Sequence, residues 1–168
     1  MRWMWIDRVL SLTPAKQLVA IKHVSLAEEH LHDHFSADDG LGPALPIMPM
    51  SLIIEGCAQT AGILVGHAGG FKEKVILAKV NRAALSRDAS AGHTLRYTAN
   101  VERIDASGAA THVIVELIDH ASNTTQEIGR VELMFSHIDQ NMAGLAFPEH
   151  NFVFGEQFKT LLRTSGVA

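Results

Sequence analysis

Residues 50–66, MSLIIEGCAQTAGILVG, form the most apolar window of this 168-residue chain. Pro49 suits the first turn of a helix, Ser51 is a candidate cap, and Gly69-Gly70 would end the helix. The window lacks the polar stripe of a surface helix and is about one turn short of a membrane span. We therefore predict a helix that is buried nearly all round.

The two clear polar side chains of this window are Glu55 and Gln59, which are four residues apart and share one helix face. A carboxyl in such a helix is costly unless it is paired, neutral or facing a wet cleft. Two interpretations stay open. Glu55 is either a structural carboxyl that caps a neighbouring strand or binds a buried water, or a catalytic acid or base whose pKa desolvation has raised.

The rest of the chain predicts strands on both sides of this helix. Mixed segments with β-branched residues predict strands over Trp3–Leu12 and Gln17–Val24, joined by a turn. After the helix the apolar period changes to two, which predicts four strands in an antiparallel meander over 74–80, 93–104, 110–119 and 127–138. The tail predicts a loop over 141–150 and a short terminal helix over 152–163. One apolar helix followed by a meander is an α+β arrangement in which the sheet covers the helix.

Composition indicates one globular domain over residues 1–168, since 47% of the residues are hydrophobic and 19% are charged. We expect 36–49 to be an inserted Gly/Pro/Asp-rich loop and 141–168 a C-terminal extension. The formal charge of -4 argues against nucleic acid or an anionic membrane as the main partner. The single Cys57 cannot form an internal disulfide, and no targeting segment precedes Asp7, so we expect a cytoplasmic protein.

Ten histidines are many for this composition, and three of them, His30, His32 and His34, occupy alternate positions. In an extended segment they would share one face, which is compatible with a zinc or iron site. A solvated histidine-rich loop with one functional histidine fits the segment better, so we predict no metal. Cys57 has no positive neighbour in the sequence and is predicted to be a small core residue.

Several motifs follow one another in a familiar order: Asp33-His34-Phe35, then Pro46-Ile47-Met48-Pro49, then LIIEGCAQTAG over 52–62. They resemble the GHFPG.PIMPG and LIIEAMAQ.AG patterns of the hot-dog-fold 3-hydroxyacyl-acyl-carrier-protein dehydratases. WIDRV over 5–9, IKHVS over 21–25 and the strand at 131–135 resemble further family motifs. The resemblance covers about residues 3–138.

This resemblance implies a hot-dog fold, in which a long central helix is wrapped by a curved antiparallel sheet. It implies dehydration of a 3-hydroxyacyl thioester, carried by acyl carrier protein or coenzyme A, to the trans-2-enoyl thioester in acyl-chain synthesis. It also implies a homodimer, or a higher oligomer built from it, with active sites at the interface. We predict no cofactor, no nucleic acid and no membrane span.

The family's catalytic pair maps onto His34 and Glu55, contributed by opposite subunits beside an apolar acyl tunnel. His34, neutral near pH 7, would take the proton from C2, and Glu55 would protonate the departing hydroxyl. Backbone N–H groups at the helix start would receive the charge that develops on the thioester oxygen. The predicted substrate-binding residues are Met50, Ser51, Gln59 and Phe35.

Three departures from the family pattern support alternatives to the dehydratase function. Met50 stands where the family has glycine, Ser36 where it has proline, and the loop from Phe35 to Pro46 is seven residues longer than the pattern. A non-catalytic hot-dog protein that binds an acyl chain or a carrier is the strongest alternative. A hot-dog thioesterase is the third.

Overall fold

The computed structural model describes residues 3–32, 34, 36–37, 42–138 and 150–167. Its elements, in chain order, are β1 (Arg8–Thr13), β2 (Gln17–His23), the short 3-10 helix η1 (Glu29–Leu31), β3 (Ile47–Met48), α1 (Met50–Ala68), β4 (Lys74–Leu85), β5 (Ala89–Ser90), β6 (His93–Asp105), β7 (Gly108–Asp119), β8 (Thr124–Ile138) and α2 (Glu156–Ser165). The predicted order of strands, helix, strands and terminal helix is confirmed. The first strand begins at Arg8, later than the predicted Trp3.

Six strands form one antiparallel sheet in the order β1-β2-β6-β7-β8-β4. The meander prediction is confirmed for β6, β7 and β8, and it is wrong for β4, which pairs with β8 at the far edge. The connection from β4 to β6 is not a hairpin, because β5 within it pairs with β3 instead. This arrangement places β4 and β1 at opposite edges of the sheet.

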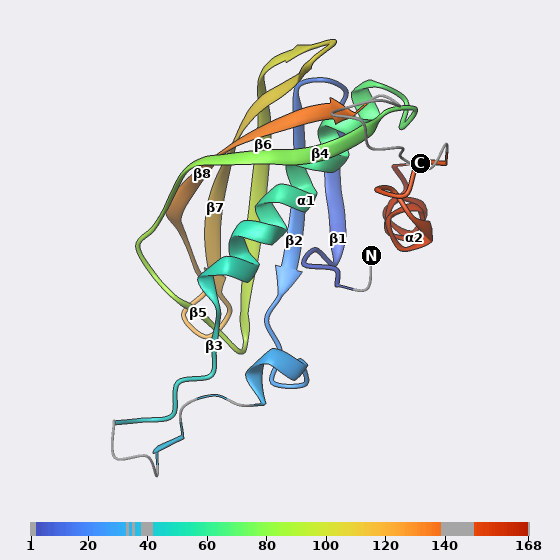
Figure 1. Ribbon diagram of the computed structural model, residues 1–168. Coiled ribbons are helices and arrows are strands. Elements are labelled where there is room, and N and C mark those ends of the chain that lie inside the picture. Colours follow the sequence, from blue (N-terminus) through green and yellow to red (C-terminus); the bar gives the residue numbers. More distant parts are fainter. Residues whose placement is uncertain (1–2, 33, 35, 38–41, 139–149, 168) are drawn as a thin grey trace.

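The sheet curves around α1, which lies across its concave side (Figure 1). The helix begins at Met50 as predicted, but Ser51 does not cap it. Pro49 holds the capping position without a side-chain hydrogen bond, and its carbonyl accepts from the N–H of Leu52 at 2.9 Å. A long helix wrapped by a curved antiparallel sheet is the hot-dog fold, so the predicted fold is confirmed.

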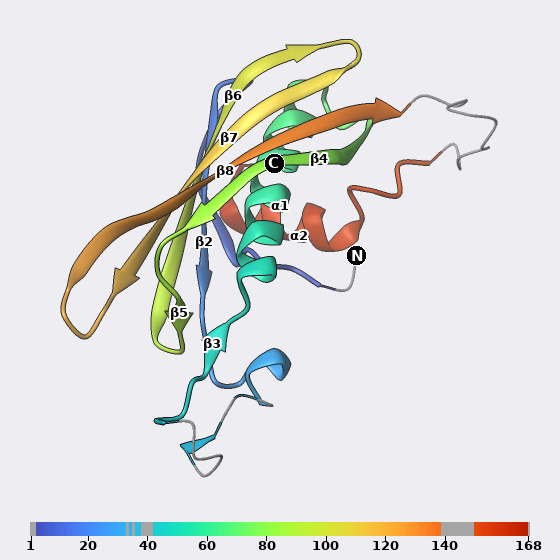
Figure 2. The same ribbon diagram turned by 60° about the vertical axis from the view of Figure 1, so that its left-hand side comes forward.

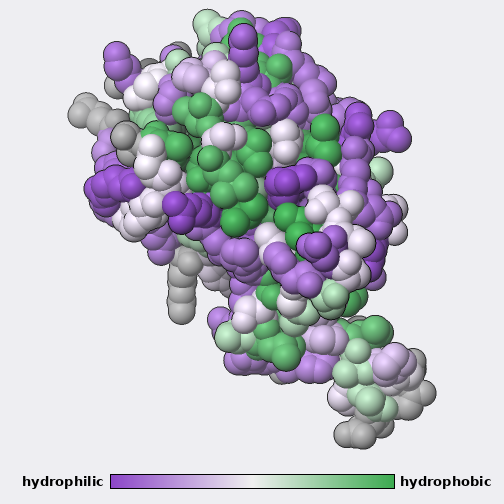
Figure 3. Space-filling model, turned by 180° about the vertical axis from the view of Figure 1, so that it is seen from behind, coloured by the Kyte–Doolittle hydropathy of each residue, from purple (hydrophilic) through white to green (hydrophobic). Residues whose placement is uncertain are grey.

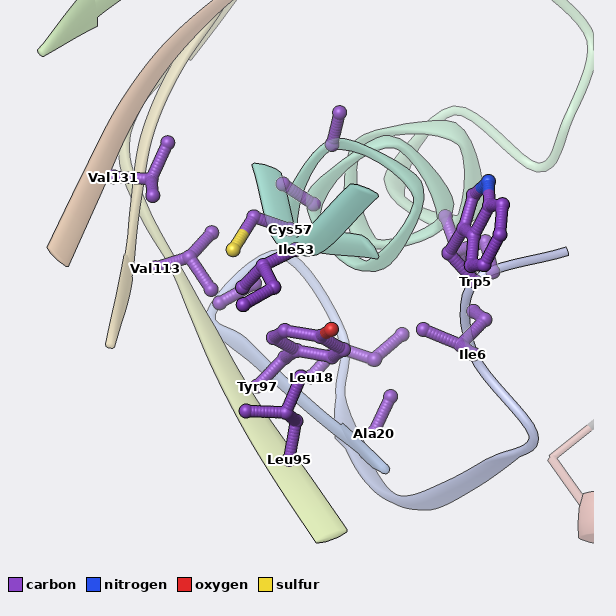
Figure 4. Packing of buried hydrophobic residues seen from close by; sticks show 14 of the residues in the cluster. Trp5, Ile6, Leu18, Ala20, Ile53, Cys57, Leu95, Tyr97, Val113 and Val131 are labelled. Carbon is purple, nitrogen blue, oxygen red and sulfur yellow. The ribbon is translucent and has the colours of Figure 1, made fainter. Parts of the chain in front are cut away.

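The core lies between α1 and the sheet (Figure 4), where Ile53 and Cys57 of the helix point toward Tyr97 and its neighbours. At Gly56 the helix comes so close that an added Cβ would lie 2.6 Å from the Tyr97 hydroxyl oxygen and 2.9 Å from the Trp5 carbonyl oxygen. Cys57 is fully buried, which raises the pKa of its thiol and confirms its prediction as a core residue.

The side of the molecule opposite to that of Figure 1 is mostly polar, with hydrophobic residues gathered near its centre (Figure 3). The described residues between η1 and β3 extend away from the body of the domain as a narrow arm (Figures 1 and 2). Within the described residues, no helix combines the length and the hydropathy needed to cross a membrane.

Candidate active site

An apolar groove of about 420 Å³ lies on the face of α1 that the sheet leaves open. It is bounded by α1, the start of β4, the end of β8 and the chain around the start of α2. Its lining residues are Glu55, Ala58, Gln59, Gly62, Ile63, Val75, Ile76, Leu77, Phe135, Phe152, Val153, Phe154 and Phe158. Its volume lies within the usual range of small-molecule sites, and its walls suit an alkyl chain.

Glu55 is the one ionisable side chain among these lining residues, and it is half-buried. The Gln59 side-chain amide donates a hydrogen bond to Glu55 Oε1 at 3.0 Å, as expected for residues one turn apart on the same helix face. This bond fixes the orientation of the carboxyl at the wall of the groove. Glu55 is therefore placed to meet a polar group on a bound acyl chain.

Gln59 is itself held by the segment that leads into β1. Its Oε1 accepts from the Trp5 N–H at 2.8 Å, and its Nε2 also donates to the Trp3 carbonyl at 3.0 Å. The amide of Gln59 thus joins the N-terminal segment to Glu55 through three hydrogen bonds. Gln59 therefore orients this carboxyl, and its predicted role in substrate binding stays a prediction.

His34 lies after η1, in the arm before β3, and it is not among the residues that line the groove of its own chain. Its Nδ1 is 2.8 Å from the Leu31 carbonyl oxygen. Because a carbonyl only accepts, Nδ1 carries the proton in this pair. In the neutral ring Nε2 is then unprotonated, which is the state that a general base requires.

Met50 and Ser51 lie at the start of α1 with exposed side chains, and neither lines the groove. Met50 therefore leaves the groove open despite replacing the family's glycine. The N–H groups of both residues precede the first helical hydrogen bonds and are available at the helix start. The predicted substrate-binding residue Phe35 lies outside the described residues.

The segment with His30, His32 and His34 is not extended, as a metal site on one face of it would require. His30 lies in η1, so the chain turns where the metal hypothesis needs an extended strand. His30 instead contacts the Trp5 ring edge-on, at a centroid distance of 5.0 Å, and lies 3.4 Å from Glu28. In the described part of the chain, no group of three or more potential ligands could hold a metal ion.

The part of the groove that sequence reasoning missed is its C-terminal wall, formed by Phe152, Val153, Phe154 and Phe158. The apolar spacing of this segment predicted a helix, and α2 confirms one over Glu156–Ser165. Nothing in the spacing indicates where that helix docks. The predicted loop over 141–150 lies almost entirely outside the described residues.

Comparison with known proteins agrees with this fold. A model of the FabA-like domain family matches residues 2–125. The chain is 31% identical, over 140 residues, to a 3-hydroxyacyl-[acyl-carrier-protein] dehydratase FabZ of Clostridium kluyveri, covering 81% of this chain and 86% of that protein. A FabZ of Campylobacter concisus is 36% identical over 103 residues, covering 57% of this chain and 65% of that protein.

Solved structures share the fold at low sequence identity. The dehydratase heterocomplex ApeI:P from Xenorhabdus doucetiae superposes with a TM-score of 0.61 at 15% identity, covering 82% of this chain and 84% of that one. An acyl-CoA hydrolase from Staphylococcus aureus gives 0.57 at 17% identity, covering 90% and 83%. The fold defines a hot-dog protein, and its groove is lined almost entirely by apolar side chains. The chain belongs to the FabA-like domain family.

Proposed function

We propose that this protein converts a 3-hydroxyacyl thioester into the trans-2-enoyl thioester and water, with acyl carrier protein or coenzyme A as the thiol. The observation that carries the proposal is Glu55, a lone ionisable group on the wall of an apolar groove, oriented by Gln59. The relatives named as FabZ dehydratases support the same reaction.

The reaction removes a proton from C2 and a hydroxyl group from C3. His34 Nε2 takes the C2 proton, because its Nδ1 proton is committed to the Leu31 carbonyl. Glu55, in its protonated form, donates to the departing hydroxyl, which leaves as water while the C2–C3 double bond forms. The N–H groups of Met50 and Ser51 stabilise the negative charge that develops on the thioester oxygen.

The two catalytic side chains come from different subunits in this proposal. Within one chain the groove contains Glu55 and does not contain His34, so a second copy supplies the base. The exposed edge of β4 supports such a dimer. Residues 78–84 are exposed on both faces of the strand, and the edge of β4 that faces away from β8 pairs with none of the described strands. A long unpaired edge presents free backbone N–H and C=O groups with which a strand of another chain can pair.

The direct test is an assay of purified protein with a 3-hydroxyacyl thioester. We expect a 2-enoyl product, and we expect His34→Ala and Glu55→Gln to lower kcat about 100-fold or more. His32→Ala is the matched control, because this exposed histidine lies two residues from His34 and should leave the rate unchanged. Acyl-thioester binding without turnover would favour the non-catalytic alternative, and release of free thiol would favour a thioesterase.

Subunit complementation tests the shared site. Co-expressed His34→Ala and Glu55→Gln chains form mixed dimers in which one of the two sites keeps both catalytic side chains. Random pairing of inactive chains should then restore about a quarter of the wild-type activity. No recovery in verified mixed dimers would mean that each site is built from a single chain.

A further inference from the structure

We propose that the C-terminal strap, defined as residues 151–162, closes the far end of the acyl groove, and that Phe154 sets the longest chain that the groove accepts. This inference rests on the proposed function for its substrate class. The strap lies beyond residues 2–125, the part of the chain that the family model matches, and it supplies four of the residues that line the groove.

The groove runs along one face of α1, with lining residues at 55, 58, 59, 62 and 63. The next position on this face is Gly66, one turn further along the helix. A side chain built there would overlap the Phe154 ring, so Phe154 occupies the space into which the groove would otherwise continue. Phe154 itself is only 6% exposed and lines the groove. Its ring is therefore the end of the groove opposite to Glu55.

Aromatic neighbours hold this ring in place. The Phe71 and Phe154 rings meet edge-on with centroids 4.9 Å apart, and Phe154 and Phe158 do so at 5.9 Å. Such edge-to-face pairs add to the stabilisation that burial provides. The end of the groove is a packed aromatic cluster, which resists displacement by an entering chain.

Asn151 fastens the start of the strap to the turn after α1. Its side-chain amide donates to the carbonyls of Phe71 at 3.0 Å and Glu73 at 2.9 Å. Its Oδ1 accepts from the N–H groups of Val153 at 3.0 Å and Phe154 at 3.4 Å. One side chain thus ties the strap to the body of the domain and sets the backbone position of Phe154.

The other end of the strap is fixed by α2, which packs against β1. The buried side chains of α2 are those of Phe158, Leu161 and Leu162. Ser165 Oγ, just beyond the strap, accepts a hydrogen bond from the Val9 N–H at 3.0 Å. This bond satisfies a backbone donor next to the register shift between Val9 and Ser11. With both ends anchored, the strap forms a wall of fixed position.

The dimensions of the groove set the size of the expected substrate. From Glu55 to Ile63 the helix rises about 12 Å. A methylene group takes slightly less than the roughly 30 Å³ of a water molecule, so 420 Å³ holds at most roughly 15 chain carbons. We expect medium-length acyl chains to bind best, with affinity falling once the chain reaches Phe154.

Two variants test whether the Phe154 ring is the end of the groove, called the end stop below. Both are measured with 3-hydroxybutyryl, 3-hydroxydecanoyl and 3-hydroxyhexadecanoyl thioesters. Phe154→Ala should raise the ratio of kcat/KM for the longest over the shortest substrate about tenfold. Gly62→Ala should shift the preference toward shorter chains, because its methyl group enters the groove, in ordinary contact with Phe135 at 3.6 Å. Leu162→Ala is the matched control, since it removes an equally buried side chain of α2 that does not line the groove.

Binding of saturated acyl-coenzyme A thioesters, followed by calorimetry in the same proteins, separates this inference from the proposed reaction. If the wild-type protein turns over no substrate but Phe154→Ala shifts the binding preference to longer chains, the end stop stands and the dehydratase proposal fails. If Phe154→Ala does not fold, Phe154→Leu, which shortens the side chain and keeps it apolar, decides. Chain-length profiles of the folded variants that match the wild type, in turnover and in binding, would overturn the role of Phe154.

Discussion

Replacement of Gln59 by alanine tests whether this residue anchors the N-terminal segment to α1. The amide of Gln59 is 95% buried and bonds to Trp5 N–H, the Trp3 carbonyl and Glu55 Oε1. In Gln59→Ala the buried Trp5 N–H loses its acceptor, which costs about 1–3 kcal/mol. The lost bond to the carboxyl adds roughly 1 kcal/mol.

The expected loss of unfolding free energy is therefore about 3 kcal/mol. For a domain of this size each kcal/mol lowers Tm by about 2–4 °C, so the variant should melt about 6–12 °C below the wild type. Urea denaturation followed by tryptophan fluorescence measures the same loss directly and reports on Trp3 and Trp5.

Thr60→Val is the control for this measurement. Thr60 is fully buried and donates to the Gly56 carbonyl at 2.7 Å, within the same helix. Its loss leaves no group unpaired, because that carbonyl keeps its helical N–H donor, so the change should stay below about 1 kcal/mol. Equal losses in Gln59→Ala and Thr60→Val would refute the anchoring argument.

Two further predictions concern the core and the histidine segment. Gly56→Ala should destabilise the protein by about 1–3 kcal/mol, because its methyl group would lie 2.6 Å from the Tyr97 hydroxyl oxygen. Gly62→Ala should be neutral or stabilising. Thermal melts of both variants measure this difference, and equal Tm values would contradict it. Burial lowers the pKa of His30 below its ordinary value of 6.5, against the opposing effect of Glu28. The unfolded chain then binds the proton at higher pH than the native one, so unfolding free energy should decrease as pH falls below about 6.5. In His30→Gln this decrease should be smaller, and an equal decrease would contradict the assignment.

Apolar patterning predicted the elements of this fold well because each is fixed by local residues. The window 50–66 is apolar on all sides, and the helix found there begins at the predicted Met50. Alternation also located β6, β7 and β8, which short turns join into a meander. The position of β4 in the sheet was predicted wrongly. The second half of this strand is exposed on both faces, so its residues show no alternation between buried and exposed positions.

The sequence predicted less of the site than of the fold, because residues far apart in the sequence form the walls of the groove. The four-residue spacing of Glu55 and Gln59 predicted that they share one helix face, and their hydrogen bond agrees. The contact between Gly66 and Phe154 joins residues 88 positions apart, and no period or motif encodes it. In the proposed dimer the place of His34 relative to Glu55 depends on a second subunit, which a single sequence describes only through the family that it resembles.

The positions of Glu55 and of the strap along α1 suggest that chemistry and chain-length selection are separable in this protein. The Met50 and Ser51 N–H groups lie at one end of α1, and the C-terminal strap lies against the other end at Gly66. These ends are about 24 Å apart along the helix. Glu55 lies nearer the first end, so a change in the aromatic cluster around Phe154 alters the depth of the groove without touching the carboxyl or its bond to Gln59. Substitutions of the strap residues that line the groove should therefore change which acyl chain is preferred while the type of reaction stays the same.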